Sequence, residues 1–191
     1  QKPIKSVGPI ANLAKLVPDA MSGTTGIAHT RWATHGAPTV ANAHPHTGAS
    51  GTVAIVHNGI IENFREIKEG LLAQGIVFVS ETDTEVLAQL IGSLYTGNLS
   101  QAVQKALKRV RGTYGLLAVS DTNPDEVVVA RMGSPVVIGV GEGEHYVASD
   151  PSALLLYTKK VVYLEDGEMA VVKADSYKLT TITGDAIQRG P

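Results

Sequence analysis

The 191-residue sequence contains no cysteine. This absence excludes a disulfide framework, a Cys-ligated zinc, an iron–sulfur cluster and a thiol nucleophile within the chain itself. Charge is also scarce, since charged residues make up 18% of the sequence, below the ~25% of an average domain. The 16 basic and 18 acidic side chains leave a net charge of −2. We therefore expect neither a nucleic-acid partner nor a membrane surface as partner.

Long hydrophobic runs are lacking too. No apolar stretch approaches the ~20 residues that span a bilayer, and residues 1–5 show no apolar signal-peptide core. We therefore expect a cytoplasmic protein in a reducing compartment. No repeat or linker divides the chain, so residues 1–191 are expected to form one domain.

The first half of the chain combines helix signals with short strands and one long loop. Apolar residues at helical spacing predict four helices, over Ile10–Val17, Phe64–Leu71, Val86–Leu94 and Val103–Val110. Thr82 and Glu85 form a capping-box pair before the third helix. Strands are predicted at Gly26–Thr30 and Thr52–Val56. The loop over residues 31–51 between them is long enough to suggest a functional role.

From Tyr114 onward the pattern changes to short strands separated by turn residues. Seven strands are predicted, at Leu116–Val119, Val127–Ala130, Val136–Val140, Tyr146–Ala148, Val161–Leu164, Met169–Val172 and Tyr177–Ile182. Their close spacing, mostly without helices between them, indicates antiparallel pairing. Several are apolar throughout, so both faces must be covered. The sequence thus predicts an α+β fold, a four-layer αββα sandwich of two antiparallel sheets flanked by helices.

The first polar cluster follows the strand that ends at Thr30. The guanidinium of Arg31 can grip a carboxylate through two parallel hydrogen bonds. Trp32, the only tryptophan, could serve as a hydrophobic lid over a site. A surface arginine beside a half-buried aromatic ring explains the same residues, so both interpretations stay open.

The second cluster is His57-Asn58-Gly59, which follows the predicted strand Thr52–Val56. An Asn-Gly pair commonly forms a two-residue hairpin turn, but here a helix follows. The Asn58 amide and the Gly59 N–H would instead supply two donors for the oxyanion of an acyl transfer.

The third cluster is the acidic run Glu81–Glu85 at the start of a predicted helix. Capping and the helix dipole explain carboxylates at this position well. A functional interpretation requires a cation, such as an ammonium group, near Asp83.

Five of the six histidines lie between residues 29 and 57. Their spacing matches no zinc signature, and no Asp or Glu lies between residues 20 and 61, so we expect polar histidines rather than a metal site. Two further signals are structural. The glycine-rich run 139–143 does not precede a helix, which disfavours a dinucleotide site, and residues 149–151 are typical of a helix cap with Pro at its first position.

Several stretches together resemble the glutaminase domains of class II, N-terminal-nucleophile amidotransferases. They are residues 26–36, 42–46, 57–63 and 80–85, with further matches at 111–115, 133–135 and 148–150. The Trp after Arg31 and the run 80–85 favour one branch, the glutamine–fructose-6-phosphate aminotransferases, or glucosamine-6-phosphate synthases. The αββα sandwich of this family agrees with the helix and strand count.

The resemblance implies a role for each site residue. Arg31 would hold the α-carboxylate of L-glutamine and Asp83 its α-ammonium group, while Asn58 and Gly59 would form the oxyanion hole. The loop over residues 31–39 would close on the substrate. Its shielding and lining side chains would be Trp32, Thr34 and His35.

The resemblance further implies that ammonia from glutamine is delivered to fructose 6-phosphate, giving glucosamine 6-phosphate without a cofactor. The partners would be C-terminal sugar isomerase domains and further copies in a homo-oligomer. The family's nucleophile is an N-terminal cysteine, which this sequence lacks. We therefore expect the nucleophile upstream of Gln1 and no turnover by this chain alone. A non-catalytic glutamine-binding regulatory homologue and a His-cluster metallohydrolase are the alternatives.

Overall fold

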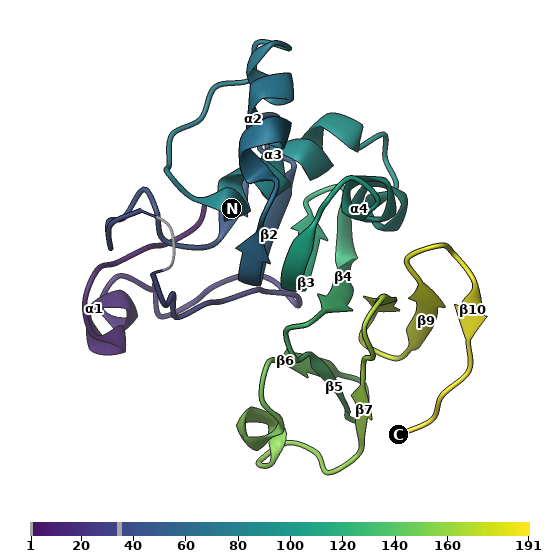
Figure 1. Ribbon diagram of the computed structural model, residues 1–191. Helices are drawn as coiled ribbons and strands as arrows, with labels where there is room; N and C mark the ends of the chain where they lie inside the picture. Colours follow the sequence, from purple (N-terminus) through teal and green to yellow (C-terminus); the bar gives the residue numbers. More distant parts are fainter. Residues whose placement is uncertain (1, 34–35) are drawn as a thin grey trace.

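The computed structural model describes residues 2–33 and 36–191. Figure 1 shows most helices beside a large sheet in the upper part of the view and a smaller sheet in the lower part. The elements of these residues are, in order, α1 (Ile10–Ala14), β1 (His46–Thr47), β2 (Val53–Ile61), α2 (Phe64–Leu72), α3 (Asp83–Leu94), α4 (Leu99–Leu107), β3 (Gly112–Ser120), β4 (Asn123–Met132), β5 (Val137–Val140), β6 (His145–Ala148), the 3-10 helix η1 (Pro151–Leu154), β7 (Val161–Tyr163), β8 (Glu168–Val172), β9 (Tyr177–Thr181) and β10 (Ala186–Ile187).

The large sheet has seven antiparallel strands in the order β1-β2-β3-β4-β8-β9-β10. Its longest ladder joins β2 to β3, from Val53 opposite Ser120 to Ile61 opposite Gly112. Most neighbours in the sheet are also neighbours in the chain, which is typical of hairpin connections. The ladder of β2 and β3 also carries part of the candidate site.

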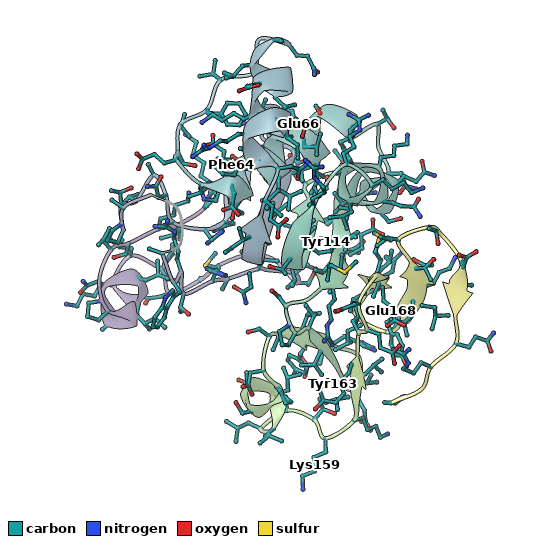
Figure 2. All side chains as sticks on the ribbon, viewed as in Figure 1. Phe64, Glu66, Tyr114, Lys159, Tyr163 and Glu168 are labelled. Carbon is teal, nitrogen blue, oxygen red and sulfur yellow. The ribbon has the colours of Figure 1, made fainter. Side chains whose placement is uncertain are left out.

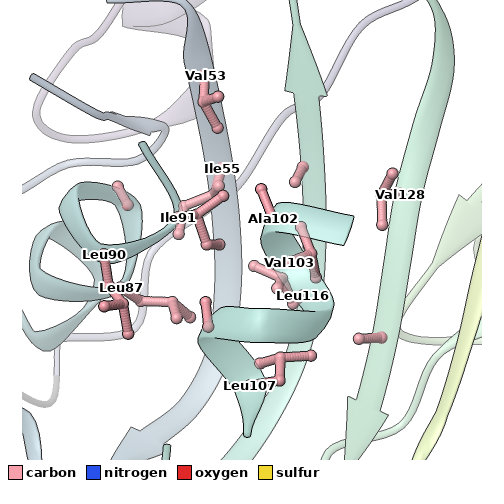
Figure 3. Packing of buried hydrophobic residues seen from close by; sticks show 14 of the residues in the cluster. Val53, Ile55, Leu87, Leu90, Ile91, Ala102, Val103, Leu107, Leu116 and Val128 are labelled. Carbon is pink, nitrogen blue, oxygen red and sulfur yellow. The ribbon is translucent and has the colours of Figure 1, made fainter. Parts of the chain in front are cut away.

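Helices α2, α3 and α4 cover one face of the large sheet. Figure 3 shows side chains of α3 and α4 directed toward β2, β3 and β4. Leu87 and Ile91 from α3 and Val103 from α4 are buried in one cluster with Ile55 and Leu116 of the sheet. Full burial of a Leu, Ile or Val side chain contributes roughly 1.5–3 kcal/mol, so this interface dominates the core.

The small sheet, ordered β6-β5-β7, packs on the other side of the large one. A second apolar cluster joins Ile138 of β5 and Val162 of β7 to Val129 of β4 and Leu179 of β9. Because side chains alternate along a strand, Gly139 faces outward, where its nearest neighbours include Leu154 of η1. The layers therefore run helices, large sheet, small sheet and η1, which confirms the predicted α+β arrangement of two antiparallel sheets with helices.

Labelled side chains locate the two ends of this layered body. In Figure 2, the half-buried Phe64 and the exposed Glu66 lie on α2 at one end, while Tyr163 of the small sheet and the nearby Lys159 lie at the other. No helix among the described residues is long and apolar enough to cross a membrane.

All seven strands predicted after residue 114 are confirmed, with small shifts at their ends. The predicted helix Ile10–Val17 is shorter, ending at Ala14. The predicted strand Gly26–Thr30 is wrong, because that segment has no strand assignment. A strand needs a hydrogen-bonded partner, and the outer edge of β2 is instead paired with β1, a two-residue strand that the sequence pattern missed. The strand predicted at Thr52–Val56 extends to Ile61 as β2.

Candidate functional site

The Asn58-Gly59 pair lies inside β2, so placing it after the strand was wrong. Asn58 is opposite Gly115 and Gly59 is opposite Tyr114 in the ladder with β3. Gly59 has a φ of +126°, and a Cβ there would run into the carbonyl group of Thr113. Only glycine fits this backbone, and the distortion occurs next to Asn58.

Beyond Gly59 the strand is held by side chains as well as by β3. The N–H of Ile60 donates to Thr113 Oγ1 at 3.1 Å, and the N–H of Ile61 donates to Asp83 Oδ2 at 2.9 Å. Asp83 is the first residue of α3 and is only 3% exposed. Its Oδ1 accepts from the N–H of Thr84 at 3.0 Å. These bonds fix the carboxylate of Asp83 beside the distorted part of β2.

The start of α3 is capped by its own loop. Thr82 Oγ1 accepts from the N–H of Glu85 at 3.1 Å, which confirms half of the predicted capping box. The Glu85 carboxylate accepts instead from the N–H groups of Val79 at 2.9 Å and Ser80 at 2.6 Å. Glu85 thereby connects the preceding loop to α3 through hydrogen bonds, which fix the position of the helix start.

Asn42 connects the loop over residues 31–51 to the segment just before α3. Its Oδ1 accepts from the N–H of Glu81 at 2.9 Å, and its Nδ2 donates to the Ala37 carbonyl at 3.0 Å. Arg31 donates to the same Ala37 carbonyl at 2.9 Å and to the Gly36 carbonyl at 3.1 Å. The guanidinium is thus oriented by the loop that it helps to fold.

Two threonine hydroxyls of the helix start organise three of the histidines. Thr84 Oγ1 lies 2.9 Å from His44 Nε2 and 3.0 Å from His57 Nδ1. Thr82 Oγ1 lies 3.1 Å from His46 Nε2. Each of these three histidines therefore has one ring nitrogen within hydrogen-bond distance of a hydroxyl at the start of α3.

Burial lowers the pKa of two histidines far below the ordinary value. The pKa of His44 falls to about 2, because of burial first and then of the neighbouring histidines and Arg31. The pKa of His46 falls to about 4, through burial and the proximity of Lys5. Burial also lowers the pKa of His29. The rings of His29, His44 and His46 are therefore uncharged at pH 7. The described residues contain no group of three or more His, Asp or Glu placed to hold a metal ion.

The predicted site residues meet in one cavity of about 320 Å³, at the lower end of the ~300–1,000 Å³ of small-molecule pockets. Arg31, Asn58, Gly59 and Asp83 all line it, although they come from a loop, from β2 and from α3. The cavity also contacts His29, Trp32, His44, His57, Thr82 and Thr84. Trp32 is 89% exposed and lies at the rim.

Two of the predicted site residues are not described by the structure, and two residues near the site were not predicted. Thr34 and His35 lie outside the described residues. The sequence pattern did not single out Thr84 or Thr113. The hydroxyl of Thr84 and the carbonyl of Thr113 each contact a ring nitrogen of His57, and the hydroxyl of Thr113 accepts from the N–H of Ile60 near the end of β2. Thr84 follows Asp83 in the sequence, and Thr113 lies in the matched run 111–115. These positions could have indicated both residues, but threonine by itself is not typical of any site.

Residues 29–156 match a family described as "Glutamine amidotransferase domain". The chain belongs to this glutamine amidotransferase family. The matched range contains Arg31, Asn58, Gly59 and Asp83, which line the cavity.

Curated relatives extend the match to nearly the whole chain. The glutamine–fructose-6-phosphate aminotransferase (isomerizing) of Chlorobaculum tepidum is 50% identical over 189 residues, which cover 95% of this chain and 31% of that protein. The enzyme of the same name from Thermus thermophilus is 48% identical over 189 residues, covering 98% of this chain and 31% of its own length. The chain thus spans about a third of the length of these relatives.

A solved structure supports the same amidotransferase fold. The glutamine phosphoribosylpyrophosphate amidotransferase from B. subtilis, complexed with ADP and GMP, matches with a TM-score of 0.67 and 28% identity. The match covers 83% of this chain and 35% of that one. It confirms the fold class predicted from the sequence.

Proposed function

We propose that this chain is the glutamine-binding part of a glutamine–fructose-6-phosphate aminotransferase. The observation that carries the proposal is the meeting of Arg31, Asp83 and the Asn58-Gly59 pair in one cavity. The identity of about half the residues to enzymes with that name supports it. In the whole protein, ammonia released from glutamine would convert fructose 6-phosphate to glucosamine 6-phosphate in C-terminal sugar isomerase domains.

Each group of the cavity has a task in this proposal. Arg31 binds the α-carboxylate of glutamine, and the buried Asp83 binds its α-ammonium group. The Asn58 amide and the Gly59 N–H stabilise the oxyanion that forms when the side-chain amide is attacked. Trp32 covers the substrate when the loop closes, with Thr34 and His35 as further lining groups, so that water is kept out.

The covalent step requires a thiol that this chain does not contain. A cysteine thiol attacks the amide carbon and gives its proton to the leaving nitrogen, so the collapse of the tetrahedral intermediate expels ammonia and leaves a thioester. Water then cleaves the thioester to glutamate and the free thiol. We place that cysteine in a segment upstream of Gln1, and we expect the 191 residues alone to bind glutamine without turning it over.

The test compares two acidic residues of the same run in the full-length protein. D83N removes the charge facing the ammonium group, and a hydrogen bond to a charged group contributes ~1.5–3 kcal/mol. The KM for glutamine should therefore rise about 10-fold to 100-fold. E81Q removes an equal charge outside the cavity, where Glu81 bonds Asn42, and should leave KM within about twofold. Equal effects of the two substitutions would refute the assignment of Asp83.

A second candidate is a glutamine-binding regulatory module without turnover, which the zero cysteine content favours. The residues encoded upstream of Gln1 distinguish the two. A cysteine directly after the initiator methionine supports the enzyme, and its absence from the whole gene supports the regulatory module.

The setting of the whole protein belongs to the same proposal. Because sugar phosphates are charged and do not cross membranes freely, we place it in the cytoplasm. We also expect a homo-oligomer, which light scattering of the full-length protein would measure.

A further inference from the structure

The side-chain amide of Asn58 has one neighbour that determines which way it faces. Asn58 Oδ1 lies 2.6 Å from His29 Nε2. If the amide were rotated by half a turn, its NH₂ group would point at His29 and its oxygen would point into the cavity. An oxygen there would repel an oxyanion, so the protonation of His29 decides whether Asn58 can act as a donor.

The surroundings of His29 place the proton on Nε2. The other ring nitrogen, His29 Nδ1, is buried and has no hydrogen-bond partner in the described part of the chain. A buried N–H without an acceptor is costlier than a ring lone pair without a donor. Burial also keeps the ring neutral at pH 7, because it lowers the pKa of His29. The single ring proton therefore sits on Nε2, where it is donated to Asn58 Oδ1.

The neighbouring histidines are held by partners of their own. His57 Nε2 lies 3.2 Å from the Thr113 carbonyl, which can only accept, so a neutral His57 leaves Nδ1 as an acceptor for the hydroxyl of Thr84. Thr84 Oγ1 must then accept from His44 Nε2. His44 Nδ1 is thus an unprotonated, buried nitrogen.

The ring of His29 is held against this fixed network. Its centroid lies 4.0 Å from that of His44, with the rings inclined by 59°. Contacts therefore run from Thr84 on α3 through His44 and His29 to Asn58 on β2. The helix start thereby influences the orientation of an amide on the sheet.

We propose that His29 is a positioning residue, which donates to Asn58 Oδ1 and so holds the Asn58 NH₂ group toward the cavity as an oxyanion donor. The inference rests on the proposed function, in which Asn58 serves the oxyanion. His29 does not touch the reacting atoms in this role. Its effect therefore belongs to the chemical step and not to the binding of glutamine.

The experiment uses the full-length protein and a pair of variants that differ in one property. H29Q keeps an N–H donor near the position of Nε2, whereas H29L keeps the bulk of the side chain without a donor. Loss of one oxyanion donor costs about 10²–10³ in kcat in a well-studied protease. We expect H29L to lower kcat for glutamate release at least about 10-fold with KM within about twofold, and H29Q to stay within about threefold of the parent.

A double-mutant cycle with N58A decides whether His29 acts through Asn58. In the N58A background the donor is already lost, so H29L should lower kcat by no more than about twofold further. Full additivity, an unchanged kcat in H29L, or equal losses in H29Q and H29L would each overturn the proposal. Circular dichroism checks folding, and H29M replaces H29L should the latter not fold. A parent protein without glutaminase activity would instead refute the proposed function, which keeps the two failures distinct.

Discussion

The hydroxyl of Thr84 is a group whose removal should lower the stability of the candidate site. It is 2% exposed and bonds two histidine rings at 2.9 and 3.0 Å. T84V has nearly the same shape but leaves the N–H of His44 Nε2 and the lone pair of His57 Nδ1 without partners. Each buried group left unsatisfied costs ~1–3 kcal/mol, so the free energy of unfolding should fall by about 2–6 kcal/mol.

The control is T84S, which keeps the hydroxyl and loses one methyl group, a change of ~0.8 kcal/mol. Urea unfolding should be followed by far-UV circular dichroism, because the only tryptophan, Trp32, is 89% exposed and reports little. In thermal unfolding, a loss of ~3 kcal/mol corresponds to roughly 6–12 °C for a chain of this size. If T84V and T84S were equally stable, the argument that this hydroxyl holds the histidines would be refuted.

Two further predictions concern stability. The pKa values of His44, about 2, and His46, about 4, lie below the ordinary 6.5, so the unfolded chain binds more protons below pH 6.5. The free energy of unfolding should have its full value above that pH and should fall toward pH 4 by up to ~1.4 kcal/mol per pH unit for each histidine. A free energy from urea unfolding that does not change with pH would contradict the burial of these rings. G59A should cost about 1–3 kcal/mol through backbone strain and contact with Thr113. G70A, in the open interior of α2, should gain about 0.5–1 kcal/mol, and similar behaviour of the two would refute the strain at Gly59.

The second half of the fold was predictable because its signals are local. Short apolar runs separated by turn residues give each strand its limits, as at Glu168–Val172 after the turn at Gly167. Antiparallel hairpins then pair neighbours along the chain. The helices were similarly marked by apolar spacing, and the cap at Thr82 was visible from the sequence.

The errors arose where the structure depends on contacts between distant residues. Asn58-Gly59 has the composition of a turn, but pairing with Tyr114 and Gly115 keeps it in β2. Gly26–Thr30 has the composition of a strand, but pairing is what makes a strand, and β1 pairs with the edge of β2 instead. Sequence patterns record the preferences of a segment and not the partner that decides its conformation.

The convergence of the site could be expected only from the resemblance, and its electrostatics needed the structure. Free glutamine is a zwitterion without net charge, with its α-carboxylate and α-ammonium groups both bonded to Cα, and we propose that Arg31 and Asp83 of the cavity bind one group each. If His29 and His44 were protonated, the same cavity would carry excess positive charge and would hold the anionic product glutamate more tightly than glutamine. Burial keeps both rings neutral, so they can direct hydrogen bonds without adding charge. We therefore expect the histidines of this site to act through the geometry of their single ring protons, and the opposite charges of Arg31 and Asp83 to select the substrate.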